Sequence, residues 1–434
     1  MEENKFSLDL VKLKNKVYNE KVIVYLLSMT LFVDAITGIM INIIGIERSP
    51  IGMIFRGGLI LYFLFYYLLN NKINKYIFIA IALYFVINIL LSYYYKHNII
   101  NGLMFDVIES TKILLMPILT LGLIAMNKSS IISYGQLKKV IDISINLLIG
   151  IYILGIIFGL GKTTYAGAGY KSVFNANNSF NIVVIVLFIF QIERTFREVN
   201  KINISKSVIL IGILIFLGSK TSLMFIPFYF ILKIIIEFKN INKKNLYIGA
   251  LVTLVGGVIT FIIFNKAIMD IINHQLYFLN KESESLITFF LSGRDKFLEV
   301  AFESFLNNIS ILAILFGVGS YYNQMSISLA LRMKTIKNIE MDFFDILFSY
   351  GVIGIIITYG ISIYIVIKNF RKIRRNKLTA EFIAFTFMML FSILAGHVFP
   401  DAMSATYLAI IVAMINLNGV NNNEDSNLTF RRFK

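Results

Sequence analysis

A succession of long apolar runs constrains this sequence more than any other feature. Most of the runs are about 17–25 residues long, which is the length that a helix needs to cross a bilayer. They are continuously apolar and do not alternate with polar residues, so they exclude a membrane β-barrel. Charged residues make up 15% of the chain, against roughly 25% in an average soluble protein. The chain is therefore predicted to be all-α and to cross a membrane many times.

The runs predict about twelve transmembrane helices in one membrane domain that comprises residues 1–434. The first run is long enough to remain as an anchor, so no cleavable signal peptide is expected. The longest segment between runs, 267–342, keeps helical spacing in part, and we expect it to be a structured extracytoplasmic loop between helices 9 and 10. The expected spans are 21–45, 51–70, 76–95, 103–126, 139–160, 178–193, 207–219, 222–237, 246–266, 343–368, 380–396 and 403–417.

The distribution of positive charge predicts the orientation of these helices. The net charge is +16, and most of the 41 Lys and Arg residues fall in alternate segments between the runs. Basic loops stay on the cytoplasmic side of membrane proteins, so both termini are predicted to be cytoplasmic. The charge is thus explained by topology and by contact with membrane lipid, and nucleic acid is not an expected partner.

The sequence offers little for metal or thiol chemistry. It contains no cysteine and three histidines, and the histidines lack the spacing that is typical of a metal site. His97, His274 and His397 are therefore interpreted as loop or interface residues, and neither a metal nor a cofactor is expected. No glycine-rich nucleotide-binding motif stands in the strand–helix context that such a motif requires.

Two short stretches place a cation near the outer membrane boundary. In the turn GSKTS, Lys220 lies between two apolar runs, and an ionisable residue at membrane depth is a candidate for function. In SGR, within the long loop, Arg294 offers the planar guanidinium that suits phosphate. The structural alternatives are a tight turn with a snorkelling lysine, and an ordinary ion pair of Arg294 with Asp295 or Glu299.

A third stretch supplies two carboxylates before an apolar helix. Glu340 and Asp342 stand where the helix dipole favours negative charge, and capping of the helix is the structural alternative. If the helix begins near Phe343, Asp342 caps it, which lowers its pKa and makes it a weak base. Glu340 then lies in the preceding loop with a longer and freer side chain, while Asp342 fixes the loop.

In this order, the stretches resemble the O-antigen ligase / Wzy polymerase superfamily of bacterial cell-surface polysaccharide assembly. Members carry a turn with Gly, Arg or Lys and Thr or Ser between two membrane helices, then a long outer loop that begins SGR. A G-x-G, an acidic or histidine element and a helix with G-x-x-G follow. Here the set reads FNANN at 174–178 for an earlier F-x-N-x-N stretch, GSKTS at 218–222, SGR at 292–294, GVG at 317–319, Glu340 with Asp342, and GVIG at 351–354.

The resemblance implies a GT-C-like membrane enzyme of the bacterial cytoplasmic membrane, with its active site outside the cell. The implied reaction is a metal-independent, inverting transfer of glycan from an undecaprenyl-pyrophosphate-linked donor to a lipid-linked repeat unit. Lys220 and Arg294 would stabilise the leaving pyrophosphate, and Glu340 or Asp342 would activate the acceptor hydroxyl. Further substrate-binding residues are expected at Arg56, Lys112, Asn175, Asn177 and Arg332.

Two departures from the family pattern bear on the reaction. Lys220 replaces the usual arginine, and no histidine occurs between residues 275 and 396, where the ligase branch has one in its long loop. The second departure favours the polymerase branch, for a capsule or another exopolysaccharide, working alongside flippase and chain-length regulator proteins. Two alternatives stay open: a ligase that moves finished polymer to another acceptor, and a flippase or transporter of lipid-linked saccharide.

Overall fold

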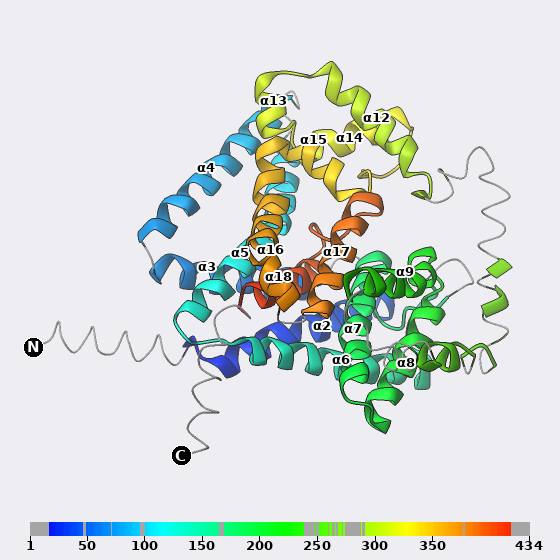
Figure 1. Ribbon diagram of the computed structural model, residues 1–434. Coiled ribbons are helices and arrows are strands. Elements are labelled where there is room, and N and C mark those ends of the chain that lie inside the picture. The colour runs from blue at the N-terminus through cyan, green and yellow to red at the C-terminus, as the bar shows by residue number, and fades with distance from the viewer. Residues whose placement is uncertain are drawn as a thin grey trace, which may run out of the picture.

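Helices follow one another along the whole described part of the chain (Figure 1). The computed structural model describes residues 17–46, 49–70, 72–95, 100–164, 169–237, 247, 251–258, 260–262, 265, 268–270, 272–273, 288, 291–375 and 378–417. No strand occurs in these residues. Six of their helical segments are long and apolar enough to cross a membrane, and shorter apolar helices accompany them. The prediction of an all-α, polytopic membrane protein is confirmed.

Each predicted span before the long loop coincides with a helix where it is described. The span predicted at 246–266 is described in part, and residues 251–258 are helical. The earlier helices are α2 (Glu20–Asn42), α3 (Pro50–Asn70), α4 (Lys72–Tyr95), α5 (Ile100–Lys128), α6 (Tyr134–Ile157), α7 (Asn177–Arg197), α8 (Lys201–Leu217) and α9 (Lys220–Glu237).

The C-terminal spans are helical as well. The first of them comprises α15 (Asp342–Ile355), a π-helical turn η1 (Ile356–Gly360) and α16 (Ile361–Arg375). It is followed by α17 (Thr379–Leu394) and α18 (Ala402–Leu417). Since α15 begins at Asp342, one residue before the expected start, Asp342 belongs to the first turn.

The long segment before α15 contains three helices, α12 (Arg294–Asn307), α13 (Ile311–Phe316) and α14 (Ser320–Ala330). They gather beside α15 at the top of Figure 1, and two of them, α12 and α14, share a small apolar cluster with it. The cluster comprises Ala301, Ile327, Ile339, Met341 and Phe348. This packing fixes the chain on both sides of Glu340, because Ile339 and Met341 are its direct neighbours.

A glycine break in α15 joins this helix to the segment between α13 and α14. Gly351 has φ 67° and ψ −170°, which interrupts the helical ladder. The carbonyls of Phe348 and Ser349 accept the N–H groups of Val318 and Gly319 at 2.9 and 3.0 Å. The glycine motifs at 317–319 and 351–354 thus form one backbone junction. Close packing of the two backbones accounts for the glycines at these positions.

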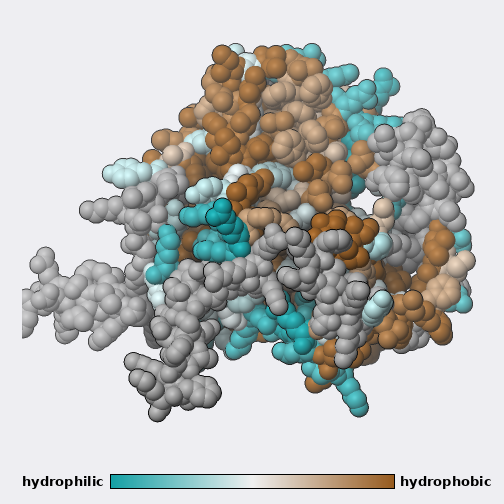
Figure 2. Space-filling model, viewed as in Figure 1, coloured by the Kyte–Doolittle hydropathy of each residue, from teal (hydrophilic) through white to brown (hydrophobic). Residues whose placement is uncertain are grey.

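The centre of the helical assembly is α18. All of its residues except Asn416 are buried, and it packs against α5, α16, α17, α7, α2 and α6. Apolar side chains are instead exposed on peripheral elements, such as Leu90 of α4, Ile311 of α13 and Ile367 of α16. In Figure 2, hydrophobic surface covers the region where α4, α13 and α16 lie in Figure 1. Such a surface is suited to lipid.

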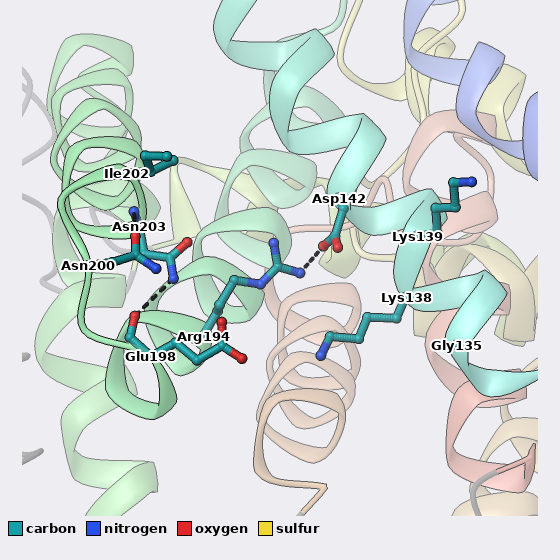
Figure 3. Close-up of a pocket in the computed structure, with 9 residues that line it drawn as sticks. All are labelled: Gly135, Lys138, Lys139, Asp142, Arg194, Glu198, Asn200, Ile202 and Asn203. Atoms are coloured by element: carbon teal, nitrogen blue, oxygen red, sulfur yellow. Dashed lines mark hydrogen bonds and ion pairs between the residues drawn. The ribbon is translucent and has the colours of Figure 1, made fainter.

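A polar cavity of about 470 Å³ lies between α6, α7 and α8 (Figure 3). Arg194 forms an ion pair with Asp142 there, and the amide of Asn203 donates to the carbonyl of Glu198 at 2.9 Å. The lining contains none of the residues that the sequence singled out for chemistry. The cavity lies at the C-terminal end of α7, which is predicted to be cytoplasmic, and the candidate site must be sought elsewhere.

Candidate active site

The turn between α8 and α9 brings Lys220 next to the SGR stretch. Gly218 ends α8 in a left-handed conformation with φ 64°, a conformation that glycine adopts at little cost. The Ser219 hydroxyl accepts the N–H of Ser222 at 3.0 Å and thereby caps the start of α9. Lys220 is the first residue of α9, and its Nζ lies 3.5 Å from the hydroxyl oxygen of Ser292. Two stretches that are 72 residues apart therefore meet.

The SGR stretch aims Arg294 at a distant carboxylate. Ser292 and Gly293 both have left-handed backbone, with φ of 55° and 77°, and α12 begins at Arg294 directly after them. The guanidinium Nη2 lies 3.0 Å from Oε2 of Glu340, and the Arg294 side chain is 12% exposed. The expected alternative, an ion pair with Asp295 or Glu299, is not what the structure has. Asp295 instead accepts the hydroxyl of Thr288 at 2.6 Å.

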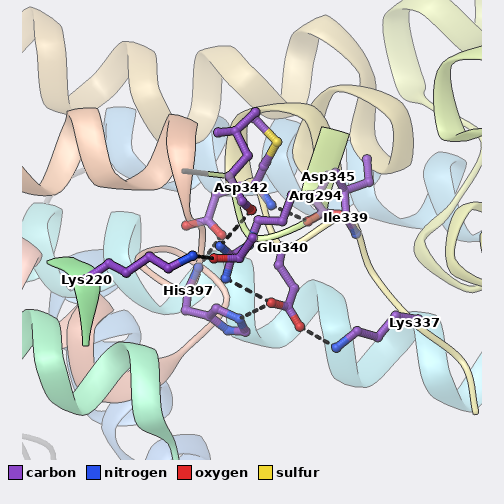
Figure 4. A network of polar contacts seen from close by, with 11 residues as sticks. Lys220, Arg294, Lys337, Ile339, Glu340, Asp342, Asp345 and His397 are labelled. Atoms are coloured by element: carbon purple, nitrogen blue, oxygen red, sulfur yellow. Dashed lines mark hydrogen bonds and ion pairs between the residues drawn. The ribbon is translucent and has the colours of Figure 1, made fainter. Parts of the chain in front are cut away.

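Glu340 is the centre of the cluster (Figure 4). Its Oε1 forms an ion pair with Lys337, and its Oε2 lies 3.9 Å from Nε2 of His397 as well as beside Arg294. In Figure 4, Lys220 extends toward the cluster from the side opposite Lys337. One carboxylate is thus surrounded by an arginine, a lysine and a histidine that come from three separate segments.

The backbone at the cluster is held in an unusual conformation. Glu340 and His397 have φ of 63° and 66°, which is uncommon for residues other than glycine. Gly396 precedes His397, and a Cβ on it would stand 2.5 Å from the carbonyl oxygen of Glu340. The two segments therefore touch through their main chains. Strained backbone of this kind gathers at functional sites.

Asp342 holds the two segments together. It is 1% exposed, and its carboxylate accepts the backbone N–H groups of His397, Val398 and Phe399 at 2.6, 2.7 and 3.0 Å. The expectation that Asp342 caps its own helix was wrong, because the N-cap residue is Met341 and no side-chain capping bond forms there. The carboxylate turns away from the helix terminus, toward the loop before α18.

We expect Asp342→Asn to destabilise the protein by about 1–3 kcal/mol, the cost of leaving a buried hydrogen-bonding group unsatisfied. An asparagine retains one acceptor oxygen, so at least one of the three N–H groups loses its partner. Thermal unfolding of the purified protein measures the effect. An unchanged unfolding temperature with lost activity would contradict this structural role and assign Asp342 to the chemistry.

Asp345 fixes the approach to Glu340 from within the same turn of α15. Its carboxylate accepts the N–H groups of Ile339 and Met341 at 3.0 and 3.3 Å. These two residues flank Glu340, so the carboxylate of Asp345 supports the left-handed backbone between them. Three neighbouring acidic residues thus have different tasks: Glu340 binds cations, while Asp342 and Asp345 bind backbone.

The charges of the cluster stabilise one another. Burial alone would raise the pKa of Glu340, but the nearby His397, the hydrogen bond from Lys337 and the charge of Arg294 hold it below its ordinary value. Burial would lower the pKa of His397, but its interaction with Glu340 and the charges of Asp342 and Asp401 raise it. Glu340 is therefore held ionised, and protonated His397 is favoured.

Sequence reasoning missed two members of this cluster. His397 was interpreted as a loop or interface residue, and Lys337 was not singled out. His397 is 57 residues beyond Glu340, and no motif spacing relates the two positions. The sequence signal for Lys337 is its separation of three residues from Glu340. The structure brings His397 to Glu340 from the loop between α17 and α18.

The other predicted substrate-binding residues have contacts outside the cluster. The guanidinium of Arg56 lies 2.6 Å from Asp34. The remaining four are placed as follows: Lys112 pairs with Glu109 at 2.5 Å, Asn177 donates to the Thr164 carbonyl at 2.9 Å, the Asn175 carbonyl accepts from Lys171 at 2.8 Å, and Arg332 is exposed.

Comparison with known proteins places the cluster in a recognised segment. No curated protein matches the chain. The family model described as "O-antigen ligase like membrane protein" matches residues 273–418, which include Arg294, Glu340 and His397 but not Lys220. The match supports a role in membrane glycan processing, as ligase or polymerase, without separating the two. Over residues 273–418 the chain is thus similar to the O-antigen ligase-like membrane proteins, and the resemblance inferred from its ordered motifs is confirmed there.

Proposed function

We propose that this protein is a polysaccharide polymerase of the bacterial cytoplasmic membrane. It transfers a growing glycan from an undecaprenyl-pyrophosphate-linked donor to a lipid-linked repeat unit at the outer leaflet. The observation that carries the proposal is the ring of Arg294, Lys337 and His397 around Glu340, with Lys220 beside it. A glycosyl transfer from a diphosphate needs preorganised cations and a carboxylate, and these groups meet here.

The cations suit a leaving group whose negative charge grows during the reaction. Preorganised donors in a site shielded from water stabilise such charge more than they stabilise the substrate, and this is usually the largest catalytic contribution. Arg294 can bind a phosphate through two parallel hydrogen bonds. Its Nε is buried and has no hydrogen-bond partner among the residues that the structure describes, so it retains donor capacity for a ligand.

The transfer itself exchanges one bond for another. The acceptor hydroxyl oxygen attacks the anomeric carbon from the face opposite the diphosphate, and its proton passes to Glu340. The bond between the anomeric carbon and the diphosphate oxygen breaks, and its electron pair leaves with the undecaprenyl pyrophosphate. This single displacement inverts the anomeric centre. The sugar–diphosphate bond of the donor provides the driving force.

The direct test is polymer formation from purified lipid-linked repeat units by the full-length protein in nanodiscs. We expect a ladder of lipid-linked glycans and release of undecaprenyl pyrophosphate. A carbohydrate gel and mass spectrometry detect the two products. Movement of the lipid-linked saccharide across the bilayer, with no new glycosidic bond, would replace the proposal with a flippase.

A ligase is the second candidate, and His397 favours it. The ligase branch of the family has a histidine in its long loop before the G-x-x-G helix, and here His397 lies 3.9 Å from Glu340, which stands in the corresponding stretch of sequence before α15. A ligase moves a finished polymer to an acceptor other than a repeat unit. Supplying the protein with preformed polymer and separate acceptors distinguishes the reactions, because a ligase leaves the polymer length unchanged.

We expect Lys220→Arg to retain polymer formation and Lys220→Ala to lose about 10²-fold, the scale for removing one transition-state donor. Arginine keeps the positive charge, and the family usually has arginine in this turn. The polymer assay measures both variants, with Lys162→Ala as a control for loss of an exposed outer lysine. Full activity of a well-expressed Lys220→Ala variant would leave Lys220 as a membrane-boundary anchor.

We expect the loop before α15 to be extracytoplasmic and the turn between α7 and α8 to be cytoplasmic, as the basic loops predict. Because the chain has no cysteine, single cysteines introduced at Lys334 and Val199 report on the two sides. A membrane-impermeant maleimide applied to whole cells should label position 334 and leave position 199 unlabelled until the cells are opened. The reverse pattern would invert the topology.

A further inference from the structure

The carboxylate of Glu340 has cations at both of its oxygens. Lys337 pairs with Oε1, while Arg294 lies 3.0 Å and His397 3.9 Å from Oε2. A carboxylate held by cations at both oxygens is a weak base for an acceptor hydroxyl. The same contacts occupy the cations, which a diphosphate also needs. In this arrangement the base is weakened, and three of the cations that a diphosphate would use are held by Glu340.

We propose that Glu340 is an internal substitute for the donor diphosphate: it occupies Arg294, Lys337 and His397 in the resting protein, and the donor displaces it. This inference rests on the proposed function and adds an order of events to it. The cations bind the diphosphate first, and the displaced carboxylate then becomes the base for the acceptor.

The chemistry of the contacts favours the exchange. A diphosphate carries more negative charge and more acceptor oxygens than one carboxylate, so it matches three cationic groups better. The unpartnered Nε of Arg294 adds a donor that Glu340 does not use. The side chains are also within reach from outside, because Lys337 is 34%, His397 29% and Glu340 19% exposed.

The backbone limits the movement to the Glu340 side chain. The main chain of Glu340 is fixed by its contact with Gly396 and by the bonds of Asp345 to both neighbouring residues. The carboxylate can therefore leave the cations by rotation about its own side-chain bonds. Once the Glu340 carboxylate has left, the cations that hold its pKa low interact with the diphosphate as well. The pKa of Glu340 then rises toward its ordinary value, and the carboxylate becomes a stronger base.

The test is the affinity of the full-length protein in nanodiscs for inorganic pyrophosphate, measured by calorimetry. If Glu340 competes for the cations, Glu340→Gln should bind pyrophosphate about tenfold more tightly than wild type or better, as expected when a site is freed from an occupied state. Glu340→Asn is the second variant, because asparagine tolerates left-handed backbone better than most residues. Glu303→Gln, an exposed carboxylate on α12, is the matched control and should bind like wild type.

Each outcome separates the inference from the proposed reaction. Equal or weaker binding by both Glu340 variants would overturn the inference and make Glu340 a scaffold that positions the cations, and so would the absence of binding by all the proteins. If Arg294→Ala, added to Glu340→Gln, abolishes the tighter binding of pyrophosphate, this result would support the inference. Tighter binding in a protein whose wild type forms no polymer would retain the inference and reject the polymerase reaction.

Discussion

Arg294→Ala is expected to lower polymer formation by about 10²–10³-fold, the effect of removing one preorganised donor from a charged transition state. The variant removes the guanidinium that lies 3.0 Å from Glu340 and that supplies the buried, unpartnered Nε. It leaves Lys337 beside Glu340, so the cluster keeps part of its charge balance. The loss should therefore appear in turnover with lipid-linked repeat units while the protein still inserts into the membrane.

Arg294→Lys distinguishes phosphate binding from a structural ion pair. A lysine preserves the charge but cannot form the paired, planar contact of a guanidinium, so this variant should also be badly impaired. Lys334→Ala, which removes an exposed cation from the same segment, is the matched control and should retain activity. Near-normal polymer formation by Arg294→Lys would mean that Arg294 only neutralises Glu340.

Glu340→Gln is expected to lower the maximal turnover by about 10²–10⁴-fold, the usual contribution of a positioned general base. Glutamine has nearly the same shape but cannot take the acceptor's proton. If Glu340 also competes with the donor, the KM for the lipid-linked donor should fall in the same variant. A lower kcat together with a lower KM is a combination that a merely destabilised protein does not produce.

Two controls test whether the effect of Glu340→Gln is specific to the role of Glu340 as a base. Glu303→Gln removes an exposed carboxylate of α12 and should leave both kinetic parameters unchanged, and thermal unfolding should show that Glu340→Gln is folded. Wild-type turnover in Glu340→Gln would remove Glu340 from the chemistry. His397→Gln would then be the next variant to measure, because His397 is the other titratable side chain that contacts the carboxylate.

Most of the fold was predictable because the length and apolar composition of membrane helices can be recognised in the sequence. The hydrocarbon core requires about 20 apolar residues for each crossing, and the predicted spans coincide with helices wherever the structure describes them. Within the site, Arg294 and Glu340 could be singled out as polar residues in an apolar chain. The direct contact between Arg294 and Glu340 could not be predicted, because the sequence suggested Asp295 or Glu299, which are close to Arg294 in the chain, as its partner.

The role of Asp342 and the presence of His397 depend on tertiary structure. A carboxylate at a helix start is usually explained by the helix dipole, and only the packed loop at 397–399 reveals that Asp342 binds three backbone N–H groups there. His397 reaches Glu340 because Gly396 lets two main chains touch. Contacts between main chains leave no periodic pattern in a sequence, so this part of the site lay beyond sequence reasoning.

The burial of α18 has a consequence for how the protein is made. This helix leaves the ribosome after α2, α5, α6, α7, α16 and α17, yet it occupies the space between them. The earlier helices therefore cannot complete their packing in the bilayer until α18 has been inserted. The loop that carries His397 comes directly before α18, so its C-terminal end is fixed only when α18 is in place. Biogenesis thus delays assembly of the candidate site, and a chain truncated before Ala402 should enter the membrane without ever becoming active.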